Sequence, residues 1–233
     1  MTKNLYLHSG AFESNPQDYL KKRNGLNVST RDADGASLLL GIGSQNDSLY
    51  RSRYELNGFF NTSRQADPLT GDTKRGTAGA YFKFQQAVWR ADRGRGTAPQ
   101  ALLLFGSLSA AINDNQPFRQ FAEMGVTYLA PFERPQDKLS LKASHMRIND
   151  KQLRAQQRAR IAHGGDSRLG RRNVYAIEAN GHFAVAPHVA VETSVQYLIR
   201  PDNFYHPEAR RLSKDGIVVG LQIMIDAGAL LGL

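Results

Sequence analysis

The feature of this sequence that most restricts its fold is an alternation of apolar and polar residues with a period of two. Between positions 138 and 148, the apolar residues Leu139, Leu141 and Ala143 alternate with polar residues. A period of two places successive side chains on opposite faces of a β-strand, whereas an amphipathic helix needs a spacing of three to four. The same alternation holds in 52–62, 119–130, 173–185, 189–199 and 217–225. The sequence therefore predicts strands with one apolar and one polar face.

Ten segments have this alternation or a strand-like composition, and turn residues separate them. They are 4–12, 36–44, 52–62, 77–90, 100–111, 119–130, 138–148, 173–185, 189–199 and 217–225. Only part of one connection, residues 151–161, has a pattern that predicts a short helix, with Lys151, Arg154 and Arg158 on one side. An all-β chain of this kind is expected to fold as a sandwich or a barrel.

The lengths of the connections favour the barrel. The odd-numbered connections are mostly long, namely 13–35, 63–76, 112–118, 149–172 and 200–216, with 112–118 as the short exception. The even-numbered connections are all short, namely 45–51, 91–99, 131–137 and 186–188. Outer-membrane barrels alternate tight periplasmic turns with longer outer loops. We therefore expect an antiparallel up-and-down transmembrane β-barrel.

Aromatic residues near the ends of the segments are candidates for the two interfacial girdles of such a barrel. They are Tyr54, Phe60, Tyr81, Trp89, Tyr128, Phe132, Tyr175, Phe183 and Tyr197. Within 77–90 aromatic residues fall on both faces, and a bulge near Gln85 and Gln86 would restore the alternation. A soluble sandwich also alternates, so a β-sandwich that binds an anionic polymer is the alternative interpretation.

The composition excludes several classes of protein. A chain of 233 residues suits a single domain over 1–233. No apolar run approaches the roughly 18 residues of a membrane-spanning helix. The first four residues lead directly into a predicted strand, without the pattern of a signal peptide, so the sequence as it stands predicts no export signal. The chain has no cysteine and a net charge of +9, which suggests a polyanionic partner such as nucleic acid, a phosphate-rich lipid surface or an acidic solute.

Much of the positive charge lies in the connection 149–172 and just before it. The basic residues are Arg147, Lys151, Arg154, Arg158, Arg160, Arg168, Arg171 and Arg172, against Asp150 and Asp166. On an outer loop this charge would contact lipopolysaccharide phosphates or steer anionic solutes. An RNA-binding arm and a merely solvated loop are the alternatives, and the segment lacks the aromatic residues on which bases stack.

Catalytic and metal-binding patterns are missing from the sequence. The six histidines are scattered without metal-ligand spacing, and neither a G-x-S-x-G elbow nor a phosphate-binding glycine loop is present. Glu178 and Glu192, on neighbouring predicted strands, could in principle act as an acid–base pair. We nevertheless expect no enzyme, no catalytic residue, no metal and no cofactor.

Several stretches resemble the carbohydrate-selective porins, the OprB-like family of outer-membrane channels, in the same order along the chain. They are 6–16 (YLHSGAFESNP), 54–63 (YELNGFFNTS), 79–90 (GAYFKFQQAVWR), 125–132 (GVTYLAPF) and the tail from 195 to 222 with VQY, HP and GLQ. The resemblance covers nearly the whole chain. Family members are about twice as long, so it implies a C-terminal portion that contributes about ten strands to a barrel of about sixteen.

The resemblance also implies a function. It implies passive diffusion of mono- or small oligosaccharides through a water-filled barrel in the bacterial outer membrane. The implied partners are membrane lipid, lipopolysaccharide and further copies of the chain, and no nucleic acid is expected. Sugar hydroxyls both donate and accept hydrogen bonds, so carboxylate, amide and guanidinium groups suit the lumen. The expected pore-lining residues are Glu55, Asn57, Lys83, Gln85, Glu123, Lys142, Glu178, Asn180, His182, Glu192 and Gln196.

Overall fold

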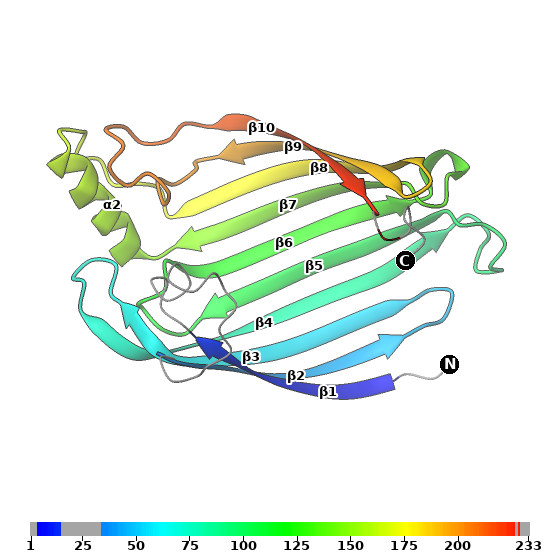
Figure 1. Ribbon diagram of the computed structural model, residues 1–233, viewed down its shortest axis with the longest axis horizontal. Helices are drawn as coiled ribbons and strands as arrows, with labels where there is room; N and C mark the ends of the chain where they lie inside the picture. Colours follow the sequence, from blue (N-terminus) through cyan, green and yellow to red (C-terminus); the bar gives the residue numbers. More distant parts are fainter. Residues whose placement is uncertain (1–3, 15–33, 227, 229–233) are drawn as a thin grey trace.

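The protein folds as one antiparallel sheet of ten strands in sequential order (Figure 1). The computed structural model describes residues 4–14, 34–226 and 228. The strands are β1 (Asn4–Ser14), β2 (Gly35–Asn46), β3 (Ser52–Ala66), β4 (Thr73–Arg90), β5 (Ala101–Ala111), β6 (Phe118–Leu129), β7 (Lys138–Ile148), β8 (Asn173–Ala186), β9 (Val189–Ile199) and β10 (Gly216–Ile225). A short 3-10 turn, η1 (Pro131–Glu133), follows β6, and one helix, α2 (Asp150–Ala162), follows β7.

Each strand pairs with its neighbours in sequence, which is the up-and-down arrangement predicted above. All ten predicted strand segments are confirmed, and so is the short helix in the connection 149–172. β1 and β10 form the two edges of the sheet, and no described strand pairs with their outer sides. The ten strands therefore form an open sheet rather than a closed barrel in this structure.

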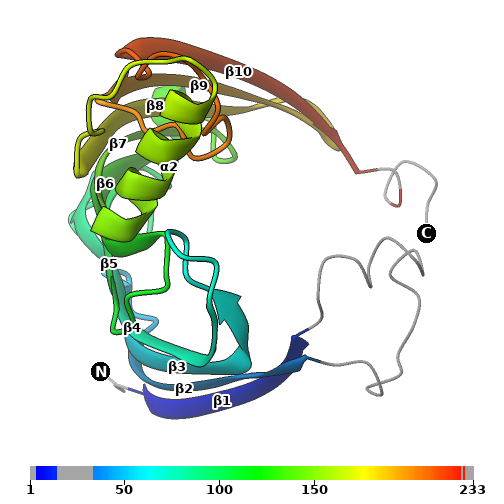
Figure 2. The same ribbon diagram turned by 90° about the vertical axis from the view of Figure 1, so that its left-hand side faces the viewer.

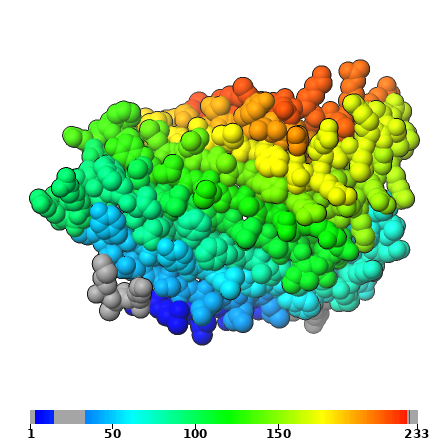
Figure 3. Space-filling view, turned by 180° about the vertical axis from the view of Figure 1, so that it is seen from behind, coloured from blue at the N-terminus to red at the C-terminus, as the bar shows by residue number. Residues whose placement is uncertain are grey.

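The sheet bends into a deep arc (Figure 2). Figure 3 shows its convex face as a continuous surface on which the strands follow one another in sequence, without a covering layer of described residues. The apolar side chains of this face are exposed: Leu7 is 74%, Leu56 55% and Val219 72% exposed. A soluble sandwich would bury these side chains against a second sheet. The sandwich interpretation is therefore wrong for the described part of the chain.

The concave face carries the polar side chains. Glu55 and Asn57 on β3 are 2% and 1% exposed, whereas Leu56 between them is one of the exposed apolar residues. Side chains converge on the inside of a curved sheet and diverge on the outside, which explains this difference within one strand. The predicted girdle aromatics lie on the convex face or in turns, except Tyr81, which pairs directly opposite Asn57 and Ser109 and so belongs to the concave face.

The connections alternate between the two ends of the sheet, as predicted, but their lengths differ less than predicted. β3 and β4 extend beyond the predicted segments and leave only Asp67–Asp72 between them, because a register shift between Asn61 and Arg64 lets the pairing continue. The even-numbered connection 91–100 is longer than this odd-numbered one. The bulge predicted near Gln85 and Gln86 lies slightly later, between Ala87 and Trp89. Most of the predicted connection 13–35 lies outside the described residues.

Helix α2 lies at the end of the sheet that carries the odd-numbered connections (Figure 1). Asn149 caps it by accepting a hydrogen bond from the Lys151 backbone N–H at 3.0 Å. Leu153 packs the helix against Ile148 and Val174 at the ends of β7 and β8. Among the described residues, no helix has the length and apolar content needed to cross a membrane.

Candidate functional site

The polar concave face is the candidate functional site. The cross-strand register places all of the predicted pore-lining residues on it, since Glu55 lies opposite Lys83, Lys142 opposite Glu178 and His182 opposite Glu192. The others are Asn57, Gln85, Glu123, Asn180 and Gln196. Their position on one face follows from the period of two and from strands that pair in sequence. Their role toward a solute stays a prediction.

Glu55 is the centre of the densest cluster on this face. Its Oε1 accepts hydrogen bonds from the Tyr6 hydroxyl at 2.5 Å and from Arg53 Nε at 2.7 Å. Its Oε2 forms an ion pair with Lys83 Nζ at 2.6 Å. Arg53 Nε also donates to the Tyr6 hydroxyl oxygen at 3.0 Å. Both oxygens of this buried carboxylate are therefore occupied by charged or hydroxyl partners.

Two glycines of β2 allow this cluster to form. Tyr6 and His8 on β1 reach across β2 to β3, where His8 Nε2 donates to Asn57 Oδ1 at 2.6 Å. A Cβ at Gly43 would lie 2.3 Å from the Tyr6 ring, and one at Gly41 would lie 2.3 Å from His8 Nε2. Only residues without a side chain leave this path across β2 open.

The cluster presents cations to the inside of the arc. The Glu55 side chain is 2% exposed, but those of Arg53 and Lys83 are 55% and 50% exposed. Asn57 is also buried, and its Nδ2 has no hydrogen-bond partner among the described residues. A solute on this part of the wall would therefore contact the guanidinium and ammonium groups, while Glu55 and Asn57 hold them and their neighbours in place.

A second group lies on β4, β5 and β6. Glu123 Oε1 accepts a hydrogen bond from the Ser107 hydroxyl at 3.0 Å. Gln85 and Thr127 line the same hollow, which has a volume of about 740 Å³ and extends to Arg53 and Lys83. This hollow therefore combines amide, hydroxyl, carboxylate and cationic groups.

A third group lies on β7, β8 and β9. Glu178 Oε2 pairs with Lys142 Nζ at 3.2 Å and accepts a hydrogen bond from Gln196 Nε2 at 3.2 Å. His182 Nδ1 lies 3.0 Å from Glu192 Oε1. A hollow of about 550 Å³ is lined by Lys138, Ser140, Glu178, Asn180, His182, Glu192, Ser194 and Gln222. Glu178 and Glu192 therefore have separate partners on this wall.

The sequence analysis did not include several members of these groups. Tyr6, His8 and Arg53 complete the Glu55 cluster, and Ser107, Ser140, Ser194 and Gln222 belong to the two hollows. Parity was a usable signal for Arg53, Ser140 and Ser194, because each lies two residues from a predicted pore-lining position on its own strand. The contact of Tyr6 with Glu55 had no such signal, since it spans a whole intervening strand.

The wall offers many hydrogen-bond donors and acceptors. Among the residues that the structure describes, no group of three or more His, Cys, Asp or Glu side chains could hold a metal ion. Carboxylate, amide, hydroxyl and cationic groups follow one another around the arc, and these groups can bind hydroxyl-rich solutes without a covalent step.

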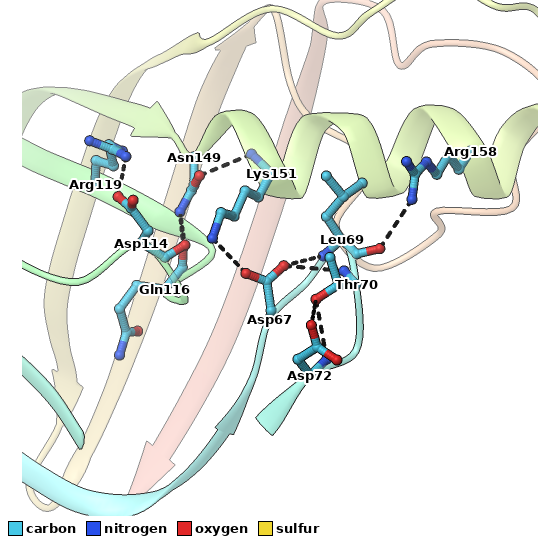
Figure 4. A network of polar contacts seen from close by, with 10 residues as sticks. All are labelled: Asp67, Leu69, Thr70, Asp72, Asp114, Gln116, Arg119, Asn149, Lys151 and Arg158. Carbon is cyan, nitrogen blue, oxygen red and sulfur yellow. Dashed lines mark hydrogen bonds and ion pairs between the residues drawn. The ribbon is translucent and has the colours of Figure 1, made fainter. Parts of the chain in front are cut away.

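A polar network joins α2 to two connections at its end of the sheet (Figure 4). Lys151 Nζ contacts Asp67 Oδ2 at 2.6 Å, and Asp67 Oδ1 accepts hydrogen bonds from the backbone N–H groups of Leu69 and Thr70 at 2.9 and 3.2 Å. These donors, with Lys151 first, lower the pKa of Asp67 to about 2. Asn149 Nδ2 donates to the carbonyl oxygens of Asp114 and Gln116. The helix is thus fixed to the β3–β4 and β5–β6 connections.

Comparisons with known proteins identify the family. The chain is similar to OprB from Pseudomonas putida in a structure solved at high pH, with a TM-score of 0.76 and 20% sequence identity. The similarity covers 95% of this chain and 55% of that chain, so this chain spans little more than half the length of that porin. At this identity the likeness shows the fold, which is that of the porin barrel. A search of curated proteins gave no match. Residues 1–226 match the family described as carbohydrate-selective porin, OprB family, whose members are outer-membrane proteins, and the chain belongs to this family.

Proposed function

We propose that the chain forms the wall of an outer-membrane channel through which mono- or small oligosaccharides diffuse passively. The observation that carries this proposal is the single curved sheet with exposed apolar side chains outside and polar groups inside. An exposed apolar face of this extent is stable in lipid and would aggregate in water. The polar face would then line a water-filled lumen.

The proposed role of the wall is to exchange hydrogen bonds with a moving sugar. Lys83, Gln85, Glu123, Lys142, Asn180, His182 and Gln196, together with Arg53, are proposed to contact hydroxyl groups. Glu55 and Asn57 support these contacts from within the wall. No bond is made or broken in this process, so we propose a channel and not an enzyme. Binding has to remain weak and distributed over several sites for the sugar to leave.

The orientation and closure of the barrel are part of the proposal. Long connections of outer-membrane barrels face the cell exterior, so the odd-numbered connections, with the basic segment 149–172, are proposed to lie at the cell surface. Unpaired backbone groups are very unfavourable in hydrocarbon. The edges of β1 and β10 must therefore be paired with other strands in the membrane.

The test is a swelling assay with the purified chain in proteoliposomes. We expect swelling in isosmotic sugar solutions, with rates that fall from mono- to tetrasaccharides. A chain that inserts, as shown by a heat-dependent shift in electrophoretic mobility, and yet gives no swelling with any sugar would contradict the channel. A chain that remains monomeric and soluble without detergent would contradict the membrane wall itself.

A further inference from the structure

Two basic connections that are distant in sequence lie side by side at one end of the sheet. The connection between α2 and β8 and the connection between β9 and β10 lie next to each other in Figure 1. The backbone N–H of Asp166 donates to the Arg210 carbonyl oxygen at 3.0 Å. A Cβ at Gly165 would lie 2.5 Å from the same oxygen, so the two backbones are in close contact.

A buried arginine fixes the first of these connections to the helix. Arg160 on α2 is fully buried, with its Nε donating to the Asp166 carbonyl oxygen at 3.1 Å and its Nη2 donating to the Arg168 carbonyl oxygen. Gly170 packs between Leu153 of the helix and Leu212 of the second connection. The arginines on these two segments therefore project from a fixed backbone.

The positive charge of these connections is only partly balanced. Residues 149–172 and 200–215 contain eleven of the 30 Lys and Arg residues of the chain but five of its 21 Asp and Glu residues. Arg168 pairs with Asp166 at 3.0 Å and Arg172 with Asp150 at 2.6 Å. We define the basic rim as Arg168, Arg171, Arg172, Arg210, Arg211 and Lys214. Within the described part of the chain, no carboxylate lies within ion-pair distance of four of these residues, namely Arg171, Arg210, Arg211 and Lys214. The side chains of all six basic-rim residues are exposed.

We propose that the basic rim binds the phosphate groups of lipopolysaccharide in the outer leaflet. Guanidinium groups match phosphate oxygens in a two-pronged geometry, and several of them on one surface suit a ligand with several phosphates. Exposed apolar side chains lie in the same connections, with Leu169 and Phe204 exposed and Tyr205 87% exposed. Cations beside apolar groups fit an amphiphilic lipid better than a free anion. The inference depends on the proposed function for the outward orientation of the odd-numbered connections.

The test measures lipid binding by the full chain in detergent, so it needs no conducting channel. The probes are fluorescent lipid A with two phosphates, its dephosphorylated form, inorganic phosphate as competitor and a short single-stranded RNA. One variant combines Arg171→Gln, Arg210→Gln and Arg211→Gln. Its matched control combines Arg51→Gln, Arg93→Gln and Arg95→Gln, which removes three exposed charges at the opposite end of the sheet. Swelling with sugars is measured separately on the same proteins.

The expected result is saturable binding of lipid A that requires its phosphates. The affinity of the basic-rim variant for lipid A should be about tenfold lower, because it loses three charged contacts that each contribute modestly. The affinity of the control variant should change by less than about twofold. Equal weakening by both variants, or full retention of binding by the dephosphorylated lipid, would overturn the proposal. Complete displacement of lipid A by millimolar phosphate would indicate a site for free anions. Tighter binding of RNA than of lipid A would indicate a nucleic-acid partner. Either result would also overturn the proposal. Loss of swelling in all proteins with lipid binding intact would instead contradict only the proposed channel.

Discussion

Replacement of Glu55 by Gln should make the proposed channel more selective for anions. In the native cluster one carboxylate compensates part of the charge of Arg53 and Lys83, which lie 2.5 and 2.6 Å from its oxygens. The substitution removes this negative charge but preserves the size of the side chain, so the wall gains one unit of positive charge. Because both cations are about half exposed, this charge acts on ions in the lumen.

The magnitude follows from Coulomb's law in a water-like medium. An anion about 4 Å from the uncompensated charge gains about 1 kcal/mol at low salt. That energy corresponds to about a fivefold increase in local anion occupancy. At 1 M salt the screening length falls to about 3 Å, so most of the increase should disappear.

The assay is the reversal potential of single channels across a KCl gradient in planar bilayers. We expect the anion-to-cation permeability ratio of the Glu55→Gln variant to rise by about fivefold at low salt. Adding Lys83→Gln restores the native charge and should return the ratio to the native value. An unchanged reversal potential at low salt in a folded, conducting variant would refute the assignment of Glu55 as the carboxylate that balances these two cations.

Three further predictions concern stability and the loop network. Gly43→Ala should destabilise the sheet by about 1–3 kcal/mol, because its Cβ would overlap the Tyr6 ring. Gly58→Ala, where a Cβ meets open space, should leave the stability unchanged. Urea unfolding in detergent measures both variants, and equal unfolding midpoints would contradict the path of Tyr6 across β2. His188→Gly should stabilise the protein by about 1 kcal/mol, since His188 has a φ of 62° in the turn between β8 and β9 and its side chain is exposed, so no buried group is lost. The same unfolding assay would show an unchanged or lower midpoint if the left-handed backbone carried no strain. The Asp67 carboxyl has its pKa lowered to about 2, so its stabilising contact with Lys151 should be complete above pH 4 and lost as the pH falls through 2. Hydrogen exchange of the α2 amides, corrected for the intrinsic rate, should show a step of decreasing protection as the pH falls through 2 in the native protein and no such step in Asp67→Asn. Asp47→Asn, at the other end of the sheet, is the control and should retain the step. A step of equal size in Asp67→Asn would assign it to another titrating group.

The sequence predicted the strands well because their signal is local. Alternation over a few residues determined each strand and the face of Glu55, Glu178 and Gln196, and these positions depend only on parity and sequential pairing. The Asp67–Asp72 connection and the bulge near Ala87 were placed less well, because they depend on how far two strands continue to pair.

The least predictable part was the Glu55 cluster. Its geometry needs the register of β1, β2 and β3 together and the absence of side chains at Gly41 and Gly43. Alternation within one strand contains none of this information, so Tyr6 and His8 were not expected near Glu55 and Asn57. The burial of Glu55 likewise follows from the curvature of the sheet, which parity does not encode. Tyr81 was misplaced for a related reason, since an aromatic residue alone does not specify its face.

The strictly sequential pairing has a consequence for the size of the pore. Backbone pairing joins each strand only to its neighbours in sequence, so a hairpin added at the β1 or β10 edge enlarges the circumference of the wall and leaves the existing pairing in place. The diameter of a barrel grows roughly in proportion to its number of strands. Gain of hairpins at these edges therefore offers an evolutionary route to wider channels, in which the polar cluster around Glu55 is retained unchanged.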